Sequence, residues 1–234
     1  MLQTATPSNV SQIGTGFYTV PEAARLLKIR PLNIRRWLGG YSYTRGDKTV
    51  PMSPLWTPQL PGHAHHIELG FRDLIELRVI KGFIDAGLSL ITIRHCLEFA
   101  RECVEDDRPF STRRFHTDGR RIFLEGLRRT GEEELLDLKD RQYVIKKMID
   151  RTFRDLDLSE DIVIRWRPFD GRQSIVIDPQ RAFGQPIASR YGVPTVVLAD
   201  AARAEGSVAE AARLYDVSPS AVRDAVRFEA SLAA

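Results

Sequence analysis

The sequence contains few cysteines and no long apolar run. Its 234 residues include two cysteines, Cys96 and Cys103, which are too few for the disulfide framework of a small secreted domain. No stretch approaches the roughly 20 consecutive apolar residues that a membrane-spanning helix needs. The first residues also lack the apolar run of a signal peptide. We therefore expect a cytoplasmic protein with no membrane partner.

Motifs of common enzyme classes are missing as well. The sequence has no Gly-rich phosphate loop and no nucleophile and base at a diagnostic spacing. His63, His65 and His66 crowd one loop, and a His-x-His alternation can place two imidazoles on one side of an extended strand. Only Glu68 nearby could complete that set, so a metal site is the less favoured alternative. We expect no enzyme activity, no catalytic residue, no metal and no cofactor.

Charge is nearly balanced overall but strongly biased in places. The chain is 43% hydrophobic and 28% charged, with a net charge of +3 and a pI of about 9.0. Its length allows one large domain or two small ones, each with its own core. A small excess of positive charge with local clustering is typical of a sequence-specific DNA-binding protein rather than a histone-like one.

The segment Thr19–Trp37 predicts a helix-turn-helix. Thr19 and Glu22 have the spacing of a capping box, and an apolar stripe follows, so we expect a helix from Val20 to Leu27. Pro31 is suited to the first turn of a second helix. That second helix would enter a DNA major groove. Its apolar side would carry Ile34, Trp37 and Leu38, and its outer side Asn33, Arg35 and Arg36.

The basic residues in this region favour contact with DNA phosphates. Between residues 25 and 48 the chain has a single acid, Asp47, against seven bases: Arg25, Lys28, Arg30, Arg35, Arg36, Arg45 and Lys48. A purely structural helix pair remains the alternative. After Gly39 and Gly40, the segment Tyr41–Ile67 is interpreted as a β-ribbon or wing with a turn at residues 44–48. Arg45 and Lys48 at its tip are phosphate-contact candidates.

Two further helices are expected after the wing. One runs from Phe71 to Gly87, and the next follows Leu88-Ser89-Leu90. Cys96 and Cys103 would share a face of this second helix. They could sense metals or oxidants, but burial in the core is favoured because cysteine is among the most buried residue types.

Residues 17 to about 100 resemble the winged-helix domain of MerR-type regulators. The resemblance lies in TVPEAARLLKI, NIRRW, the wing and ELGFRDLIELRVIKGFIDAGLSLITIRHCL. It implies that Arg35 is the foremost DNA-contacting side chain. MerR proteins dimerise through a long helix directly after this domain. Here Asp106, Asp107 and Pro109 interrupt the chain at 102–110, so a MerR-type dimer is not expected.

The middle of the chain is interpreted as a small mixed α/β module. Residues 115–124 around Asp118-Gly119 predict a hairpin. A helix is expected over Asp140–Asp155, followed by strands Ile162–Trp166 and Ser174–Ile177 joined through 168–171. The acidic and basic clusters here predict solvated surface rather than an active site.

The last fifty residues predict a second helix-turn-helix. Residues 194–205 form one helix, Ser207 and Glu210 a capping box, and Ser218-Pro219 the start of the final helix. Ser220, Arg223 and Arg227 lie on its outer side as candidates for DNA contact. The unit could equally serve dimerisation.

Residues of about 175–230 resemble a small bacterial antitoxin-like domain of the VapB type. The pattern is Asp178-Pro179, Gly184-Gln185-Pro186 and Gly192-Val193-Pro194-Thr195 before the helix-turn-helix, without the usual Arg-Gly-Thr-Arg. A two-part antitoxin of this type, with an N-terminal MerR-like domain, resembles the whole chain. The resemblance implies a PIN-like ribonuclease toxin as partner. Charge complementarity alone suggests Arg165 and Arg167 as toxin-binding residues.

These inferences combine into one organisation. We expect a mainly α fold with small β elements (α+β). Its parts are a flexible arm (1–16), a winged helix-turn-helix (17–104), a mixed module (105–174) and an antitoxin-like helix-turn-helix domain (175–234). The expected function is a DNA-binding antitoxin that neutralises a PIN-like toxin and represses its own operon as a homodimer or higher oligomer. The alternative is a stand-alone MerR-like regulator whose middle module senses a ligand.

Overall fold

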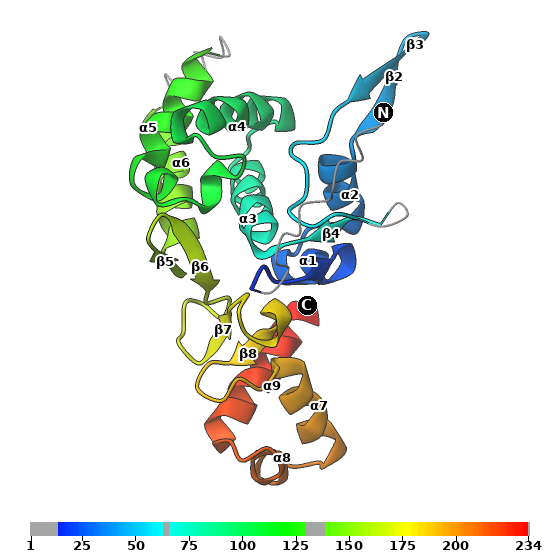
Figure 1. Ribbon diagram of the computed structural model, residues 1–234, viewed down its shortest axis with the longest axis vertical. Helices are drawn as coiled ribbons and strands as arrows, with labels where there is room; N and C mark the ends of the chain where they lie inside the picture. Colours follow the sequence, from blue (N-terminus) through cyan, green and yellow to red (C-terminus); the bar gives the residue numbers. More distant parts are fainter. Residues whose placement is uncertain (1–13, 63–65, 130–138, 234) are drawn as a thin grey trace, which may run out of the picture.

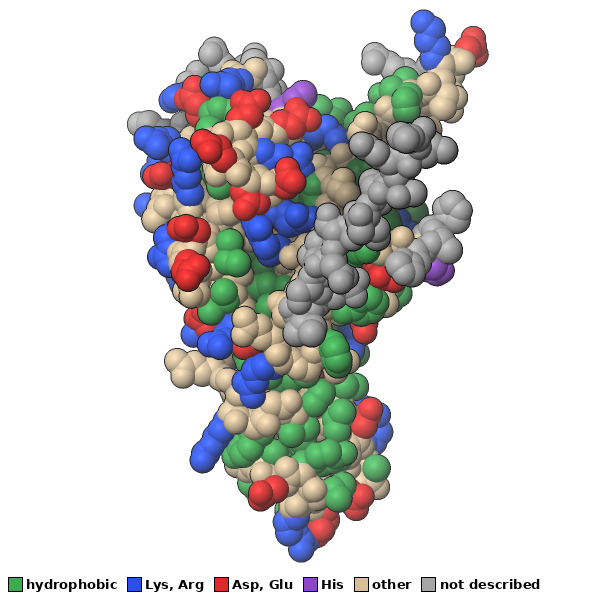
Figure 2. All heavy atoms as spheres, viewed as in Figure 1, with side chains coloured by type: hydrophobic (Ala, Val, Ile, Leu, Met, Phe, Trp, Pro, Cys, Tyr) green, Lys and Arg blue, Asp and Glu red, His purple; other side chains and the backbone are tan. Residues whose placement is uncertain are grey.

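The computed structural model describes residues 14–62, 66–129 and 139–233. Over these ranges the chain is mainly helical, with nine α-helices and three small antiparallel sheets, as expected for the fold class. The chain extends along one axis, as the ribbon (Figure 1) and the space-filling view (Figure 2) both show. A protruding hairpin lies at one end and helix α8 (Val208–Leu214) at the other. The histidines His63 and His65 and residues 1–13 of the expected arm lie outside the described residues.

The N-terminal part has the predicted order of elements. Helix α1 (Val20–Leu27) is followed by α2 (Pro31–Gly39), then by the hairpin of β2 (Tyr41–Arg45) and β3 (Lys48–Met52). Strand β1 (Tyr18–Thr19) pairs with β4 (Glu68–Leu69) across the base of this unit. Helices α3 (Phe71–Asp85) and α4 (Leu90–Val104) complete it. The chain breaks after α4, as the acids and the proline predicted, and resumes in the 3-10 turn η1 (Pro109–Ser111).

The hairpin predicted around Asp118-Gly119 is wrong. Residues 113–129 form one helix, α5 (Arg113–Arg129), that contains both residues. Phe115, Phe123 and Leu127 recur on one side of α5 and are fully buried. Phe123 stacks on Phe83 of α3, with ring centroids 3.8 Å apart. Burial of this apolar face outweighs the local turn preference of an Asp-Gly pair.

A second helix and a four-stranded sheet follow. Helix α6 (Lys139–Phe153) packs against α3 and α5. The sheet has the order β5 (Leu156–Ser159), β6 (Ile162–Trp166), β7 (Ile175–Ile177) and β8 (Pro186–Ala188). The predicted strands over 162–166 and 174–177 correspond to β6 and β7, which pair antiparallel at Trp166 and Ile177. Strands β5 and β8 were not anticipated.

The apolar core is divided unequally. One cluster runs from Tyr18 to Ile177, so α5, α6 and β5–β7 share the core of the N-terminal winged unit. A second cluster, from Ala188 to Ala225, lies among α7 (Thr195–Ala204), α8 and α9 (Pro219–Ala233). Of the expected arm, Gly16 is buried, and the Thr15 carbonyl accepts a hydrogen bond of 2.8 Å from the Phe71 amide.

Candidate nucleic-acid interface

The start of α1 is closed by the predicted capping box. The Thr19 amide donates to Glu22 Oε2 at 2.7 Å, and the Glu22 amide donates to Thr19 Oγ1 at 3.4 Å. At the other end, Lys28 adopts a left-handed conformation (φ 53°) that ends the helix. The Ile29 amide then bonds back to the Ala24 carbonyl at 3.1 Å. These contacts confirm the short turn that leads into α2.

Helix α2 has one buried side and one exposed basic side. Ile34, Trp37 and Leu38 are buried, as predicted. On the opposite side Arg35 and Arg36 are exposed and Asn33 is half-buried. Arg30, just before the helix, is also exposed. Arg30, Arg35 and Arg36 are therefore accessible to a ligand, and Asn33 is partly accessible.

The two arginines of that face differ in their surroundings. The Arg36 guanidinium lies over the Tyr41 ring, 4.5 Å from its centroid, so stacking restricts its plane. Arg35 has no side-chain hydrogen bond or ion pair within the described part of the chain, and neither has Arg30. Free guanidinium groups on an exposed helix face suit bidentate contact with guanine or with phosphate.

The wing is held firmly at its base. The Leu55 amide donates to the Trp37 carbonyl at 2.7 Å, and the Arg94 guanidinium donates to the Ser53 and Pro54 carbonyls at 2.8 and 3.1 Å. Gly40 is required at the junction, because φ is +74° and a Cβ would lie 2.7 Å from the Met52 carbonyl oxygen. The wing therefore has a defined direction relative to α2.

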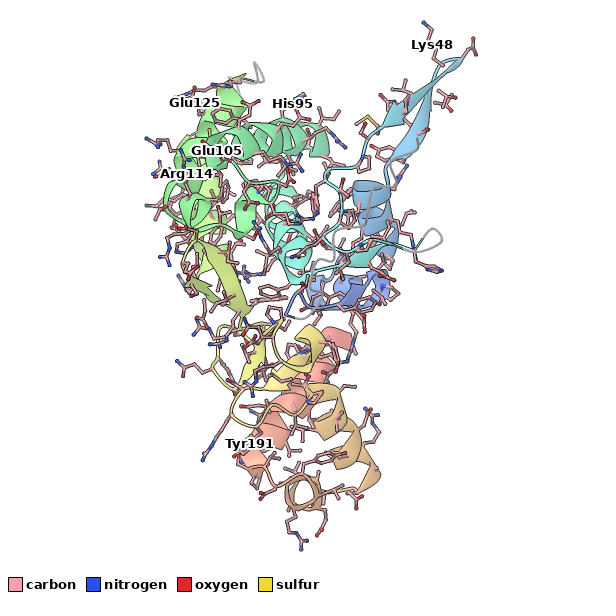
Figure 3. All side chains as sticks on the ribbon, viewed as in Figure 1. Lys48, His95, Glu105, Arg114, Glu125 and Tyr191 are labelled. Atoms are coloured by element: carbon pink, nitrogen blue, oxygen red, sulfur yellow. The ribbon has the colours of Figure 1, made fainter. Side chains whose placement is uncertain are left out.

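The wing tip carries the expected basic residues. Arg45 and Lys48 are cross-strand partners at the end of β2 and β3. Lys48 is exposed and points away from the body of the protein (Figure 3). The placement fits a contact with the DNA backbone beside the groove that α2 would enter.

The C-terminal unit also forms a helix-turn-helix. The Ser207 side chain accepts from the amides of Ala209 and Glu210 at the start of α8, and the Ala221 amide donates to Ser218 Oγ at the start of α9. The Tyr191 hydroxyl accepts from the Ser218 amide at 3.1 Å, and hydrogen bonding with the Ser218 side chain and with this amide lowers the pKa of Tyr191. Tyr191 lies beside the first turn of α9 (Figure 3).

The outer side of α9 carries the other predicted DNA contacts. Ser220, Arg223 and Arg227 are exposed, whereas Asp224 is half-buried. Ser220 Oγ lies 2.9 Å from Ser218 Oγ. Among the predicted DNA residues, those of α2 and the wing lie at one end of the chain and those at the start of α9 lie towards the other (Figure 1). The fold does not gather them into one continuous surface.

An ion pair joins the two helix-turn-helix units. Arg25 of α1 pairs with Glu229 of α9, whose side chain is 11% exposed. Glu229 also accepts a hydrogen bond from the Thr195 hydroxyl at the start of α7. Nothing in the sequence pattern linked α1 to α9, because neither charge stands out among so many charged neighbours.

The two arginines predicted to contact a toxin have partners within the chain. Arg165 Nε donates to Asp178 Oδ2 at 2.8 Å, and Arg167 Nη2 donates to Asp157 Oδ1. The Arg165 side chain is 47% exposed and that of Arg167 22%. Arg165 lies on β6 and Arg167 directly follows this strand, and Arg165 also lines a hollow of about 360 Å³.

The described residues offer neither a membrane-spanning helix nor a metal-binding cluster. Within residues 14–62, 66–129 and 139–233, no helix is long and apolar enough to cross a membrane. The same ranges hold no cluster of three or more His, Cys, Asp or Glu side chains suited to a metal ion. Cys96 is buried in the core and Cys103 is half-buried.

Comparisons with known proteins give one relative and one solved structure of note. The chain is 27% identical over 221 residues to a protein of Mycobacterium tuberculosis (strain ATCC 25618 / H37Rv) named "Putative antitoxin VapB45", covering 89% of this chain and 92% of that protein. The fold resembles the crystal structure of Rv2018 from Mycobacterium tuberculosis, with a TM-score of 0.69 at 23% identity over 89% of this chain and 96% of that one. No family model matches the chain.

Proposed function

We propose that this chain is the antitoxin of a type II toxin–antitoxin system. It binds operator DNA, neutralises a PIN-like ribonuclease toxin and represses its own operon. The observation that carries the proposal is the similarity to a protein named as a VapB antitoxin, which extends over nine-tenths of both chains. The similarity covers the N-terminal winged unit as well as the C-terminal unit, so it supports a two-part antitoxin rather than an isolated DNA-binding domain.

DNA binding is proposed for α2 and the wing. Asn33, Arg35 and Arg36 would face the bases, and Arg30, Arg45 and Lys48 would contact phosphates. The exposed face of α2 and the fixed direction of the wing support this assignment. Ser220, Arg223 and Arg227 are assigned a secondary contact. A homodimer would place two copies of α2 on the two halves of an operator.

The antitoxin assignment is tested by co-expression with the product of the adjoining reading frame. If the chain is the antitoxin, it should restore growth in cells that express this product, co-purify with the product and suppress its RNA cleavage. If the wild-type chain neither co-purifies with the product nor changes its activity, the antitoxin assignment is wrong. Retained binding to the upstream DNA would then favour a stand-alone regulator.

A further inference from the structure

An aromatic side chain stands almost fully in solvent at the junction between the two helix-turn-helix units. Phe183, in the turn η3 (Ala182–Gly184), is 83% exposed. Phe17 is 45% exposed, and its amide donates a hydrogen bond of 2.9 Å to the Phe183 carbonyl. In Figure 1, η3 lies beside the first described residues of the chain. Two neighbouring exposed phenylalanines are the kind of apolar surface that marks a contact site.

The backbone holds Phe183 outward in a strained conformation. Ala182 and Phe183 have φ angles of 47° and 54°, in the left-handed region that residues with a Cβ disfavour. Gly184 follows with φ 83°, and a Cβ there would lie 2.4 Å from the Tyr18 hydroxyl oxygen. Conformations of this kind persist where the surroundings impose them, and they cluster at functional sites.

Both halves of the chain impose this conformation. The Tyr18 hydroxyl donates to the Gly184 carbonyl at 2.8 Å, and the Gly184 amide donates to the Arg181 carbonyl at 2.9 Å. The turn is therefore fixed from the N-terminal side by Tyr18 and Phe17 and from its own side by Arg181. Phe183 is presented by a rigid support, which lowers the entropy lost when a partner binds.

Phe183 borders one hollow, and a second hollow adjoins the first. One, of about 500 Å³, lies among Gly14, Phe17, Leu60, Pro179, Gln180, Ala182 and Phe183. A second, of about 360 Å³, shares Gly14, Pro179 and Gln180 with the first and extends to Arg165. Phe183 and Arg165 therefore border one uneven surface with the Pro179-Gln180 segment between them. Arg181 is exposed two residues before Phe183, although it lines neither hollow. We call Phe17, Arg165, Pro179, Gln180, Arg181 and Phe183 the Phe183 surface.

The charge on this surface is of one sign. Arg165 and Arg181 are exposed, whereas Asp178 is 3% exposed and paired with Arg165. Arg165 uses Nε for that pair, and Arg181 uses Nη1 to bond the Ser189 carbonyl at 3.0 Å. The other guanidinium nitrogens of Arg165 and Arg181 can still donate hydrogen bonds. They suit a partner that offers carboxylates around an apolar recess.

We propose that the Phe183 surface is where the toxin docks, with Phe183 entering an apolar recess that acidic side chains border. The inference rests on the proposed antitoxin function and moves the expected contact from Arg165 and Arg167 alone to an aromatic anchor with a flanking arginine. A buried aromatic ring surrounded by charge pairs is the usual composition of an interface hot spot. Because both halves of the chain build this surface, the toxin contacts the unit that carries α2 as well as the C-terminal unit.

The test replaces Phe183 in the full-length chain and measures binding to the purified product of the adjoining reading frame. Phe183→Asn removes the ring while asparagine tolerates the left-handed conformation. Phe183→Tyr keeps the ring. Leu214→Asn, at the end of α8 with 63% exposure, is the matched control for loss of an exposed apolar side chain. Thermal unfolding and binding to the upstream DNA report whether each variant is folded.

We expect F183N to weaken binding at least about 30-fold, while F183Y and L214N stay within a few-fold of the wild type. Equal binding by folded F183N and wild type overturns the Phe183 surface and leaves the antitoxin assignment standing. Failure of the wild type to bind overturns the antitoxin assignment, and the surface with it. A change of oligomeric state in F183N with unchanged toxin binding assigns the surface to a second copy of the chain and overturns the proposal.

Discussion

The Tyr18 hydroxyl donates a hydrogen bond of 2.8 Å to the carbonyl of Gly184, which is 166 positions further along the chain. Tyr18 is buried, and burial raises the pKa of its hydroxyl, so the group stays a donor at any working pH. With the Arg25–Glu229 ion pair, this contact joins the N-terminal winged unit to the C-terminal unit. The sheet adds to these contacts, because β7 packs in the N-terminal core and its partner β8 packs in the C-terminal core.

The contact predicts non-additive effects of substitution at its two ends. Tyr18→Phe leaves the Gly184 carbonyl without its donor and should cost about 1–2 kcal/mol of the free energy of unfolding. Gly184→Ala should cost about 1–3 kcal/mol, because its Cβ meets the Tyr18 hydroxyl and φ is positive. In the double variant the hydroxyl is gone, so the total loss should be smaller than the sum. Urea unfolding of the four proteins measures this, and strict additivity would contradict the contact.

Glu76 predicts a dependence of stability on pH. The carboxyl is fully buried in α3, where Glu76 Oε1 accepts from the Ser111 amide at 2.8 Å, and burial raises its pKa to about 8. Between the ordinary pKa of 4.5 and about 8, the unfolded chain releases this proton and the folded chain keeps it. The stabilisation is therefore complete below the lower value and is lost as pH rises towards 8, by roughly 1 kcal/mol per pH unit.

Replacement of this carboxyl by a neutral amide isolates its effect. Glu76→Gln should flatten the decline in the free energy of unfolding between pH 5 and pH 8, measured by urea unfolding at several pH values. Glu102→Gln is the control, because the Glu102 side chain is 73% exposed. If E76Q and the wild type keep the same slope over this range, Glu76 is ionised in the folded protein.

DNA binding should depend on the outer face of α2. Arg35→Ala combined with Arg36→Ala should weaken binding to the upstream DNA by about 10- to 100-fold and reduce its salt dependence, because two guanidinium charges that would displace counterions from the DNA are lost. Arg120→Ala with Arg121→Ala removes the same charge from the exposed side of α5 and serves as the control. Fluorescence anisotropy at several salt concentrations measures the affinity and the salt dependence of both double variants. Equal loss in the two double variants would indicate a general charge effect.

The C-terminal helix-turn-helix is tested in the same way. Arg223→Ala with Arg227→Ala should weaken DNA binding by about 3- to 10-fold, which is less than the loss in the α2 double variant. The reason is that α9 has fewer basic residues than α2 and the wing, and that Asp224 lies next to Arg223. Sedimentation of the same variant reports on dimerisation. Unchanged DNA binding together with a shift to monomer would assign this unit to self-association.

The helical state of residues 113–129 predicts a steric effect at Gly126. A Cβ there would lie 3.2 Å from the Cα of Cys96, because α5 and α4 approach closely at this point. Gly126→Ala should therefore cost about 1–2 kcal/mol of stability despite the better helix propensity of alanine. Thr117→Ala, on the exposed side of α5, should be nearly neutral. Equal stability of both variants would argue against this packing of α5 on α4.

Local patterns determined much of this protein from sequence. Thr19 and Glu22 place the start of α1, Pro31 starts α2, and Ser207 and Ser218 start α8 and α9. Each signal depends only on residues within one helical turn, so it can be recognised in the sequence without knowledge of the tertiary structure. The exposed arginines of α2 follow directly, because the apolar stripe fixes which side faces the core.

Only the tertiary structure decided the rest, since long-range contacts have no local signature. Asp118-Gly119 favours a turn by itself, but burial of Phe115 and Phe123 against α3 and η1 makes it part of a helix. Phe183 is an ordinary apolar residue in the sequence. Its left-handed conformation and its exposure exist because Tyr18 and Phe17, far away in the chain, hold the backbone around it. Where the two units meet depends on contacts that no sequence pattern specifies.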